Sequence, residues 1–204
     1  MRPWNVFFND RVRKIFSEGH DVLDIGGGLR LSKEKGNRYN KKNEWMRKLS
    51  EKVSYKVLDP ISTYHPDIVG DIEHLPLLDN SQDAIICLSI LESVKDPAKG
   101  VEEMYRVLKP GGRCLAYVPF LYYYHAEAGY YPDYWRFTED SLPHLFQLFS
   151  KVEIQRLHGA VETWLKLSPL GRSKALLALG RVADILFRKT ESKETSGFYI
   201  FATK

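Results

Sequence analysis

Short apolar runs alternate with longer amphipathic stretches along most of the chain. Seven of these runs have the length and the content of branched and aromatic residues that are typical of strands. Residues 84–90 (AIICLSI) are apolar throughout, which indicates a strand buried on both faces. The expected strands are residues 21–25, 54–59, 67–69, 84–90, 113–120, 151–157 and 197–203.

The stretches between these runs have the spacing of helices. Apolar residues recur at i, i+3, i+4 and i+7 in the stretch that ends at KPGG, namely Val101, Met104, Tyr105 and Leu108. Thr138 is the expected N-cap of a helix over residues 139–149. Further helices are expected at residues 6–17 and 43–52, and over much of residues 158–196.

Strands that alternate with helices predict an α/β fold in which helices cover both faces of a mostly parallel sheet. With 204 residues and 44% apolar content, the chain can bury one core, so we expect a single domain over residues 1–204. No run approaches the roughly 20 apolar residues of a membrane span, and we expect a cytoplasmic protein. Cys87 and Cys114 lie inside expected strands, which favours buried thiols over a disulfide or a metal site.

The net charge of +4 is unevenly distributed. Residues 1–52 carry 13 Lys/Arg against 7 Asp/Glu, residues 53–150 carry 7 against 14, and residues 151–204 carry 10 against 5. Basic ends could approach phosphate, nucleic acid or an anionic membrane. No block of five like charges is present, so a solvated surface is the simpler interpretation.

Candidate chemistry begins where the first expected strand runs into GGG. The carboxyl ends of parallel strands are where such sheets bind ligands, and glycines allow backbone to approach a ligand closely. The dinucleotide fingerprint would need glycine at position 31, which is leucine, and no Walker pattern follows. Asp24, Asp59 and Asp71 stand at the ends of three successive expected strands. Each could be an ordinary loop acid, but their recurrence points to a ligand site.

Four segments in order carry a family resemblance: VLDIGGG, KVLDP, GDIEHLPLLDNSQDAIICLSILESVKDP and EEMYRVLKPGGRCLAYVPF. Over residues 20–157 the chain resembles class I S-adenosylmethionine-dependent methyltransferases, most closely the branch of ubiquinone/menaquinone-biosynthesis methylases. The resemblance implies a Rossmann-like fold with a seven-stranded, mostly parallel sheet and an antiparallel last strand. It also implies S-adenosylmethionine as the cofactor.

The resemblance further implies roles for individual residues. Asp59 would accept from the ribose hydroxyls, and Asp71 from the adenine amine, with Ile72 beside the ring. The turn that frames the methionine part would contain Asp24, Gly26, Gly27 and Gly28, and the pocket would be lined by Leu88, Ser89 and Ile90 at the end of the fourth strand. The family's third glycine falls at Arg30, and residues 31–43 have the character of an insertion.

Residues 122–140 (YYYHAEAGYYPDYWRFTED) follow the fifth expected strand. Nine of the 26 aromatic residues lie between positions 120 and 137, and aromatic faces suit sugar rings or flat acceptors. An oxygen nucleophile needs its proton removed, so we expect His125 to be the base, with Tyr124 and Asp133 beside it. For Trp135 and Phe137 we favour packing under the next helix, with Arg136 paired to an acid.

We therefore expect O-methylation of a small molecule or glycan. A non-catalytic binding module with the same fold is one alternative, and a nucleic-acid methyltransferase is a weaker one, because no Asn-Pro-Pro-Tyr motif is present. Residues 172–189 predict a helix with an apolar face and basic ends. That helix could contact a membrane peripherally or pair with a second subunit in a homodimer, but covering the sheet is the ordinary role and the one we favour.

Overall fold

The computed structural model describes residues 2–31 and 39–204. Its strands are β1 (Asp21–Ile25), β2 (Ser54–Asp59), β3 (Ile68–Val69), β4 (Gln82–Leu88), β5 (Leu108–Pro119), β6 (Lys151–Leu157) and β7 (Gly197–Thr203). Its α-helices are α1 (Pro3–Glu18), α2 (Glu44–Ser50), α3 (Pro97–Val107), α4 (Ser141–Leu145), α5 (Ala160–Leu167) and α6 (Lys174–Leu186). Most of the expected insertion at residues 31–43 lies outside the described residues.

The strands form one seven-stranded sheet in the order β3-β2-β1-β4-β5-β7-β6. β1 pairs in parallel with β2 and β4, β2 with β3, and β4 with β5. β7 lies antiparallel between β5 and β6. The predicted fold class, including the antiparallel last strand, is confirmed.

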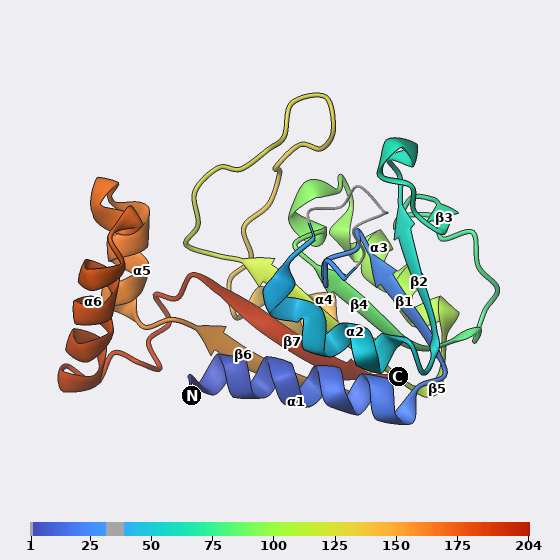
Figure 1. The fold of residues 1–204 in the computed structure, drawn as a ribbon, viewed down its shortest axis with the longest axis horizontal. Coiled ribbons are helices and arrows are strands. Elements are labelled where there is room, and N and C mark those ends of the chain that lie inside the picture. The colour runs from blue at the N-terminus through green and yellow to red at the C-terminus, as the bar shows by residue number, and fades with distance from the viewer. Residues whose placement is uncertain (1, 32–38) are drawn as a thin grey trace.

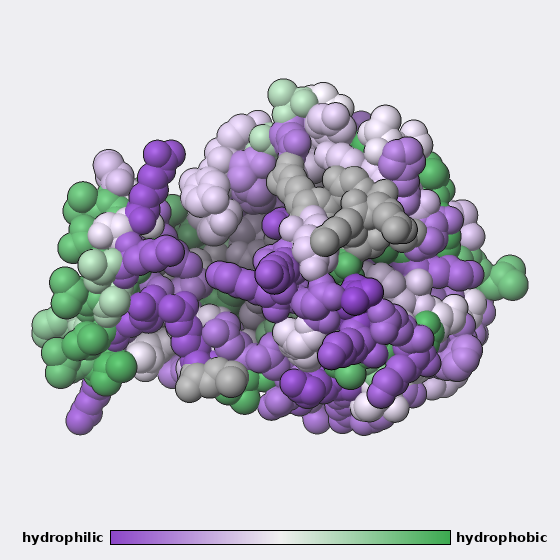
Figure 2. Space-filling view, viewed as in Figure 1, coloured by the Kyte–Doolittle hydropathy of each residue, from purple (hydrophilic) through white to green (hydrophobic). Residues whose placement is uncertain are grey.

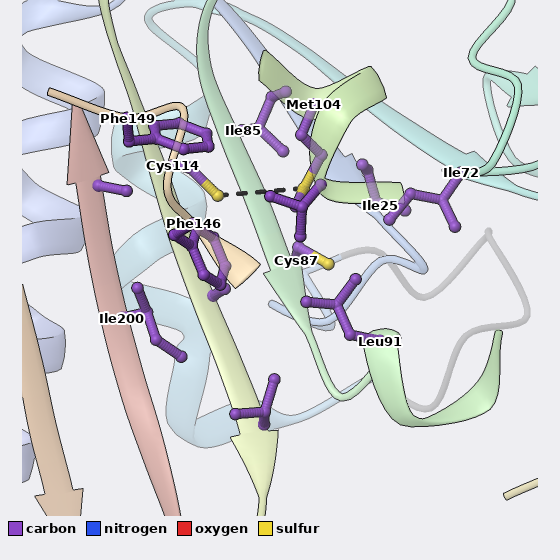
Figure 3. Close-up of a cluster of buried hydrophobic side chains, with 14 of the residues drawn as sticks. Ile25, Ile72, Ile85, Cys87, Leu91, Met104, Cys114, Phe146, Phe149 and Ile200 are labelled. Carbon is purple, nitrogen blue, oxygen red and sulfur yellow. Dashed lines mark hydrogen bonds between the residues drawn. The ribbon is translucent and has the colours of Figure 1, made fainter. Parts of the chain in front are cut away.

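Helices cover both faces of this sheet (Figure 1). α1 and α2 pack on one face, where Ile15 and Met46 are buried. α3 and α4 pack on the other, where Met104 and Phe146 lie in the larger cluster of buried side chains (Figure 3). Successive residues of β4 are buried on alternate faces, so its apolar run has no polar alternation.

Both cysteines are buried in the larger cluster, as the sequence predicted (Figure 3). The Cys114 Sγ lies 4.0 Å from the Met104 Sδ. Burial raises the pKa of the Cys114 thiol to about 12. Both side chains therefore act as small hydrophobes in this core.

Two expected boundaries at β4 and β5 were wrong. β4 ends at Leu88 and not at residue 90, because Ser89 adopts a left-handed conformation (φ 59°) that turns the chain out of the sheet. β5 begins at Leu108, which was expected to belong to the preceding helix, since Leu108 pairs with Gln82 before the register shifts. Gly111, at φ 77°, takes part in that irregularity.

The helix expected over residues 139–149 is also shorter than predicted. α4 covers only Ser141–Leu145, and Asp140, not Thr138, is its N-cap residue. Pro143 explains the late start. In a helix from residue 139 it would break an interior hydrogen bond, whereas in α4 it is the third residue, where the N–H has no helical partner.

The helix predicted over residues 172–189 does not cover the sheet, which corrects that expectation. Neither core cluster includes a described residue of α5 or α6. The two helices pack against each other as a hairpin beside the end of β6, at the left of Figure 1. Among the described residues, no helix combines the length and apolar content needed to cross a membrane.

Phe198 tests the core on which β7 depends. Its side chain is fully buried between the sheet and α4, so Phe198→Ala should lower the free energy of unfolding by about 3–5 kcal/mol. Leu78→Ala is the matched control, because Leu78 is 81% exposed and should change stability little. Urea unfolding followed by circular dichroism measures both. Equal effects of the two substitutions would contradict the assignment of Phe198 to the core.

Candidate active site

The turn after β1 brings bare backbone against the end of β4. Gly26 has φ 74°, and a Cβ there would lie 2.1 Å from the Ile90 Cδ1 atom. At Gly28 an added Cβ would lie 2.7 Å from the Leu88 Cβ atom. Side chains are therefore excluded at both positions, and the turn leaves its backbone facing a cavity.

Asp24 supports this turn from below. Its carboxylate accepts hydrogen bonds from the N–H groups of Gly28 and Leu29, each at 3.0 Å, and from the Tyr55 hydroxyl at 2.5 Å. Complete burial raises the pKa of Asp24 to about 6, although these hydrogen bonds oppose the shift. Asp24 does not line the cavity. It therefore supports the turn through its hydrogen bonds but is not exposed to a ligand in the cavity.

Arg30 stands where the family's third glycine falls. Its φ is 53°, in the left-handed region that glycine occupies at little cost. Arg30 is exposed and lines the cavity. The turn therefore forms with Arg30 in place of the glycine, and Arg30 adds a positive charge to the cavity wall.

The cavity has a volume of about 480 Å³. It lies at the carboxyl ends of the parallel strands, below the loop of residues 120–137 that rises over the sheet in Figure 1. Of the predicted site residues it is lined by Gly26, Gly27, Gly28, Asp59, Asp71, Ile72, Leu88, Ser89, Ile90 and His125. Tyr124 and Asp133 do not line it.

Asp59 and Asp71 each support the turn after their own strand. Asp59 accepts from the Ile61 N–H at 2.8 Å, and Asp71 accepts from the Glu73 N–H at 2.9 Å. Asp59 is 8% exposed, and burial raises the pKa of its carboxyl group. Asp71 is exposed at the cavity wall. Both acids combine a local hydrogen bond with a place in the cavity lining.

His125 comes from the loop of residues 120–137 and is fixed by its neighbours. Its backbone N–H donates to the Asp133 carboxylate at 2.9 Å. The ring Nδ1 lies 3.1 Å from the Tyr123 carbonyl oxygen and 3.2 Å from the Asp133 Oδ2. Since both of these atoms accept hydrogen bonds, Nδ1 carries a proton and Nε2 is the nitrogen directed elsewhere.

Arg136 holds the same loop together. Its guanidinium group donates to both carboxylate oxygens of Asp133 at 2.5 and 2.7 Å, as well as to the Tyr122 and Tyr123 carbonyl oxygens. Arg136 holds the pKa of Asp133 down at about 2. The predicted pairing of Arg136 with an acid is confirmed, and the contacts of Asp133 are those of a positioning residue for His125.

Glu92 was missed by the sequence reasoning. It follows β4 in a short 3₁₀ segment, its side chain is fully buried, and it lines the cavity. Within the described part of the chain, neither carboxylate oxygen has a hydrogen-bond partner. The His125 Nε2 lies 3.5 Å from one of them, which is an ion-pair distance. An acid inside the apolar segment ILESV was the available signal.

The Glu92–His125 pair needs a proton of its own. Because Nδ1 already carries one, the Nε2 lone pair of a neutral ring would face a carboxylate oxygen. The Glu92 carboxylate accordingly raises the pKa of His125, the largest of several influences. The imidazolium form of His125 satisfies this contact and leaves the second Glu92 oxygen as an acceptor at the cavity.

Tyrosines close the cavity from the loop side. Tyr130 stacks on Tyr64, with ring centroids 5.4 Å apart and an angle of 10° between the planes. Further tyrosines line the wall, namely Tyr117, Tyr122, Tyr123 and Tyr131. Tyr124, expected at the reaction centre, is 75% exposed and lies outside the lining.

The remaining aromatic predictions divide between the core and the surface. Phe137 is buried in the larger cluster, as expected. Trp135 is 44% exposed, so its expected packing was wrong. Its indole N–H donates to the Val94 carbonyl oxygen at 2.9 Å, which ties the loop to the segment after Glu92.

Comparison with known proteins agrees with this arrangement. A family model described as a methyltransferase domain matches residues 40–116. Over this segment in sequence, and over most of the chain in fold, the protein is similar to class I S-adenosylmethionine-dependent methyltransferases. The resemblance that the sequence motifs indicated is thus confirmed. The match ends before the loop of residues 120–137, so it covers the side of the cavity formed by the strand ends and not the side formed by the loop.

Its curated relatives include methylases of quinone biosynthesis. The demethylmenaquinone methyltransferase of Renibacterium salmoninarum is 32% identical over 117 residues, which is 56% of this chain and 46% of that protein. The ubiquinone/menaquinone biosynthesis C-methyltransferase UbiE of Haemophilus ducreyi is 46% identical over 48 residues, 24% of this chain and 18% of that protein. The chain spans less than half the length of these relatives.

Solved structures share the fold at low identity. A methyltransferase from Archaeoglobus fulgidus superposes with a TM-score of 0.59 at 15% identity, covering 97% of this chain and 93% of that one. The 1,6-didemethyltoxoflavin-N1-methyltransferase of Burkholderia thailandensis gives 0.56 at 13% identity, with coverage of 96% and 75%. These likenesses establish the fold of this chain.

The contact between Glu92 and His125 predicts how the stability of the protein depends on pH. A His whose folded-state pKa is raised contributes stability that is present below its unfolded pKa of about 6.5 and is lost as the pH rises through the folded value. Glu92→Gln removes the main cause, so the pKa of His125 should fall and this pH-dependent stability should shrink. Side-chain NMR titration and thermal unfolding across pH measure the two effects.

Glu102→Gln is the control for that titration. Glu102 is exposed on α3, distant in sequence from the loop that holds His125, and its substitution should leave the His125 titration unchanged. If Glu92→Gln leaves the pKa of His125 unchanged, the two side chains are not coupled.

Proposed function

We propose that this chain binds S-adenosylmethionine in the 480 Å³ cavity and methylates a hydroxyl oxygen of a small molecule or glycan. The observation that carries the acceptor part is the buried Glu92 carboxylate, which has no hydrogen-bond partner among the described residues and lines the same cavity as His125. A buried carboxylate oxygen without a hydrogen bond is costly, so a ligand that donates a hydrogen bond is the natural complement.

The residues of the cavity fit the cofactor. Gly26 and Gly28 have no side chains at this turn, so its backbone lines the cavity that the cofactor would enter. Asp59 supplies a carboxylate suited to a pair of ribose hydroxyls, while Asp71 and Ile72 supply an acceptor and an apolar surface for adenine. When bound, S-adenosylmethionine supplies an activated methyl group on a positively charged sulfur.

The acceptor side must then orient a nucleophile, remove its proton and exclude water. Glu92 and His125 are the groups in the lining with the contacts for proton removal, since the hydroxyl can donate to the second Glu92 oxygen. The hydroxyl proton would pass to this acid–imidazole pair, and the oxygen would take the methyl group as the bond from that carbon to the cofactor sulfur breaks. The tyrosine wall and the Tyr64–Tyr130 stack restrict water.

The atom that receives the methyl group is a separate question. The printed names of the relatives include C-methylation and quinone biosynthesis, and a hydroxylated aromatic ring could be methylated on carbon after losing its hydroxyl proton. We favour oxygen, because the second Glu92 oxygen has no hydrogen-bond partner among the described residues and would accept a hydrogen bond from a hydroxyl group in the cavity. Mass spectrometry and NMR of the product distinguish an O-methyl group from a C-methyl group.

The other interpretations make different demands. A non-catalytic binding module has no use for a buried acid–histidine pair at the cavity, although it could retain the cofactor-binding turn. A nucleic-acid methyltransferase should bind RNA or DNA with a strong dependence on salt. The acidic balance of residues 53–150, which contain most of the cavity lining, disfavours a polyanionic acceptor.

Asp59 provides the test of cofactor binding. Asp59→Asn keeps the size of the side chain but removes the charge, so it should weaken binding of S-adenosylmethionine and S-adenosylhomocysteine by about tenfold or more. Isothermal titration calorimetry gives both dissociation constants. Asp140→Asn is the control, since the Asp140 side chain is 89% exposed on α4. No binding of either compound to the native chain would refute the proposed function.

Glu92 and His125 provide the test of proton removal. Glu92→Gln and His125→Ala should each lower turnover by about 10²–10⁴-fold while leaving the dissociation constant of S-adenosylhomocysteine nearly unchanged. Turnover is read as formation of S-adenosylhomocysteine with a panel of phenols, catechols and sugars. Glu102→Gln serves again as the control. If both variants turn over at the native rate, Glu92 and His125 have structural roles only.

A further inference from the structure

The hairpin of α5 and α6 exposes an unusual amount of apolar surface. Of the seventeen large apolar side chains that are exposed among the described residues, eight lie within residues 164–187. Figure 2 shows hydrophobic residues gathered over this hairpin, at the left of the molecule. The eight are Trp164, Leu167, Leu170, Leu179, Val182, Ile185, Leu186 and Phe187.

One face of α6 is fully used in holding the hairpin together. The buried Asp184 carboxylate accepts from the N–H groups of Val161 and Glu162 at 2.8 and 3.0 Å, and so caps the start of α5. Gly180 lets the helices approach closely, because a Cβ there would lie 2.5 Å from the Leu165 Cδ1 atom. The inner face is therefore specified by close packing.

The opposite face of α6 is exposed to solvent in the part of the chain that the structure describes. Leu179, Val182, Ile185 and Leu186 are spaced three or four residues apart, or adjacent, so they form one stripe along the helix. Their exposures are 64%, 53%, 67% and 73%. We call these four residues the α6 stripe. Phe187, 69% exposed, extends it at the end of the helix.

The charges around the stripe have one sign. Residues 164–190 contain six Lys/Arg and one acid, and that acid is the buried Asp184. Four of the basic residues are exposed, two at each end of α6, namely Arg172, Lys174, Arg188 and Lys189. An apolar stripe between basic ends is the pattern of a helix that lies in the surface of an anionic membrane.

We propose that the α6 stripe and its basic ends dock on an anionic lipid surface. Apolar side chains would enter the headgroup region while the basic ends contact lipid phosphates. A second copy of this chain is a poorer partner, since apposed stripes would bring the like charges together. Nucleic acid is also poorer, because its phosphates offer nothing for the apolar stripe. The proposal is independent of the methyl-transfer chemistry.

Binding to vesicles tests the proposal with the full chain. The protein should float with vesicles of phosphatidylglycerol and phosphatidylcholine, much less with phosphatidylcholine alone, and binding should weaken as salt is raised. Leu186→Asp should weaken the binding by about tenfold or more, since it places a charge where an apolar side chain would enter the membrane. Leu78→Asp is the matched control, because Leu78 is 81% exposed outside the hairpin.

The basic ends are tested separately. Lys174→Glu combined with Arg188→Glu should weaken binding to phosphatidylglycerol vesicles by about tenfold or more. Circular dichroism and S-adenosylhomocysteine binding of each variant check that the chain is folded. Three outcomes would overturn the proposal: no flotation of the native chain, equal effects of Leu186→Asp and Leu78→Asp, or a dimer in solution that Leu186→Asp dissociates.

Discussion

Strands that run in the same direction must end at the same edge of a sheet, and the cavity of this protein depends on that constraint. Beyond a strand end the hydrogen-bond ladder stops, so the N–H groups of the following turn need other acceptors. Asp24, Asp59 and Asp71 supply them, each for the turn after its own strand. The acids that the family resemblance assigns to the cofactor thus also build the surface on which it would lie. Each of these side chains therefore combines the role of an ordinary loop acid with the role proposed for it in ligand binding.

The opposite wall has no regular secondary structure to support it. The loop of residues 120–137 instead depends on Arg136, whose five-donor guanidinium group satisfies loop carbonyl oxygens and the Asp133 carboxylate together. Asp133 passes this order on to the backbone and ring of His125, and Glu92 meets the ring from the β4 side. The candidate acid–base pair is therefore assembled from two chain segments, and each segment is fixed before any ligand arrives.

The sequence predicted those features that arise from local patterns. Apolar runs predicted all seven strands, and the order of motifs predicted the direction of the last one and the turns at the strand ends that line the cavity. Features set by distant contacts were not predictable. Nothing local distinguishes Tyr130, which stacks over the cavity, from Tyr124, which faces solvent. Glu92 gains its meaning only from contact with His125, and the α6 stripe has the spacing of an ordinary core helix. Pro143 was a local signal that outweighed the N-cap at Thr138.

The hairpin of α5 and α6 enters and leaves the sheet at adjacent points. Leu157, the last residue of β6, pairs directly with Gly197, the first residue of β7, so the 39 residues between them close on themselves at one rung of the ladder. A shorter connection could join the same two residues without altering any strand register. The α5–α6 hairpin is thus a separate projection from the sheet, whereas the last residues of the connection, Thr195 and Ser196, accept hydrogen bonds from the N–H groups of Leu121 and Phe120 at the start of the loop over the cavity.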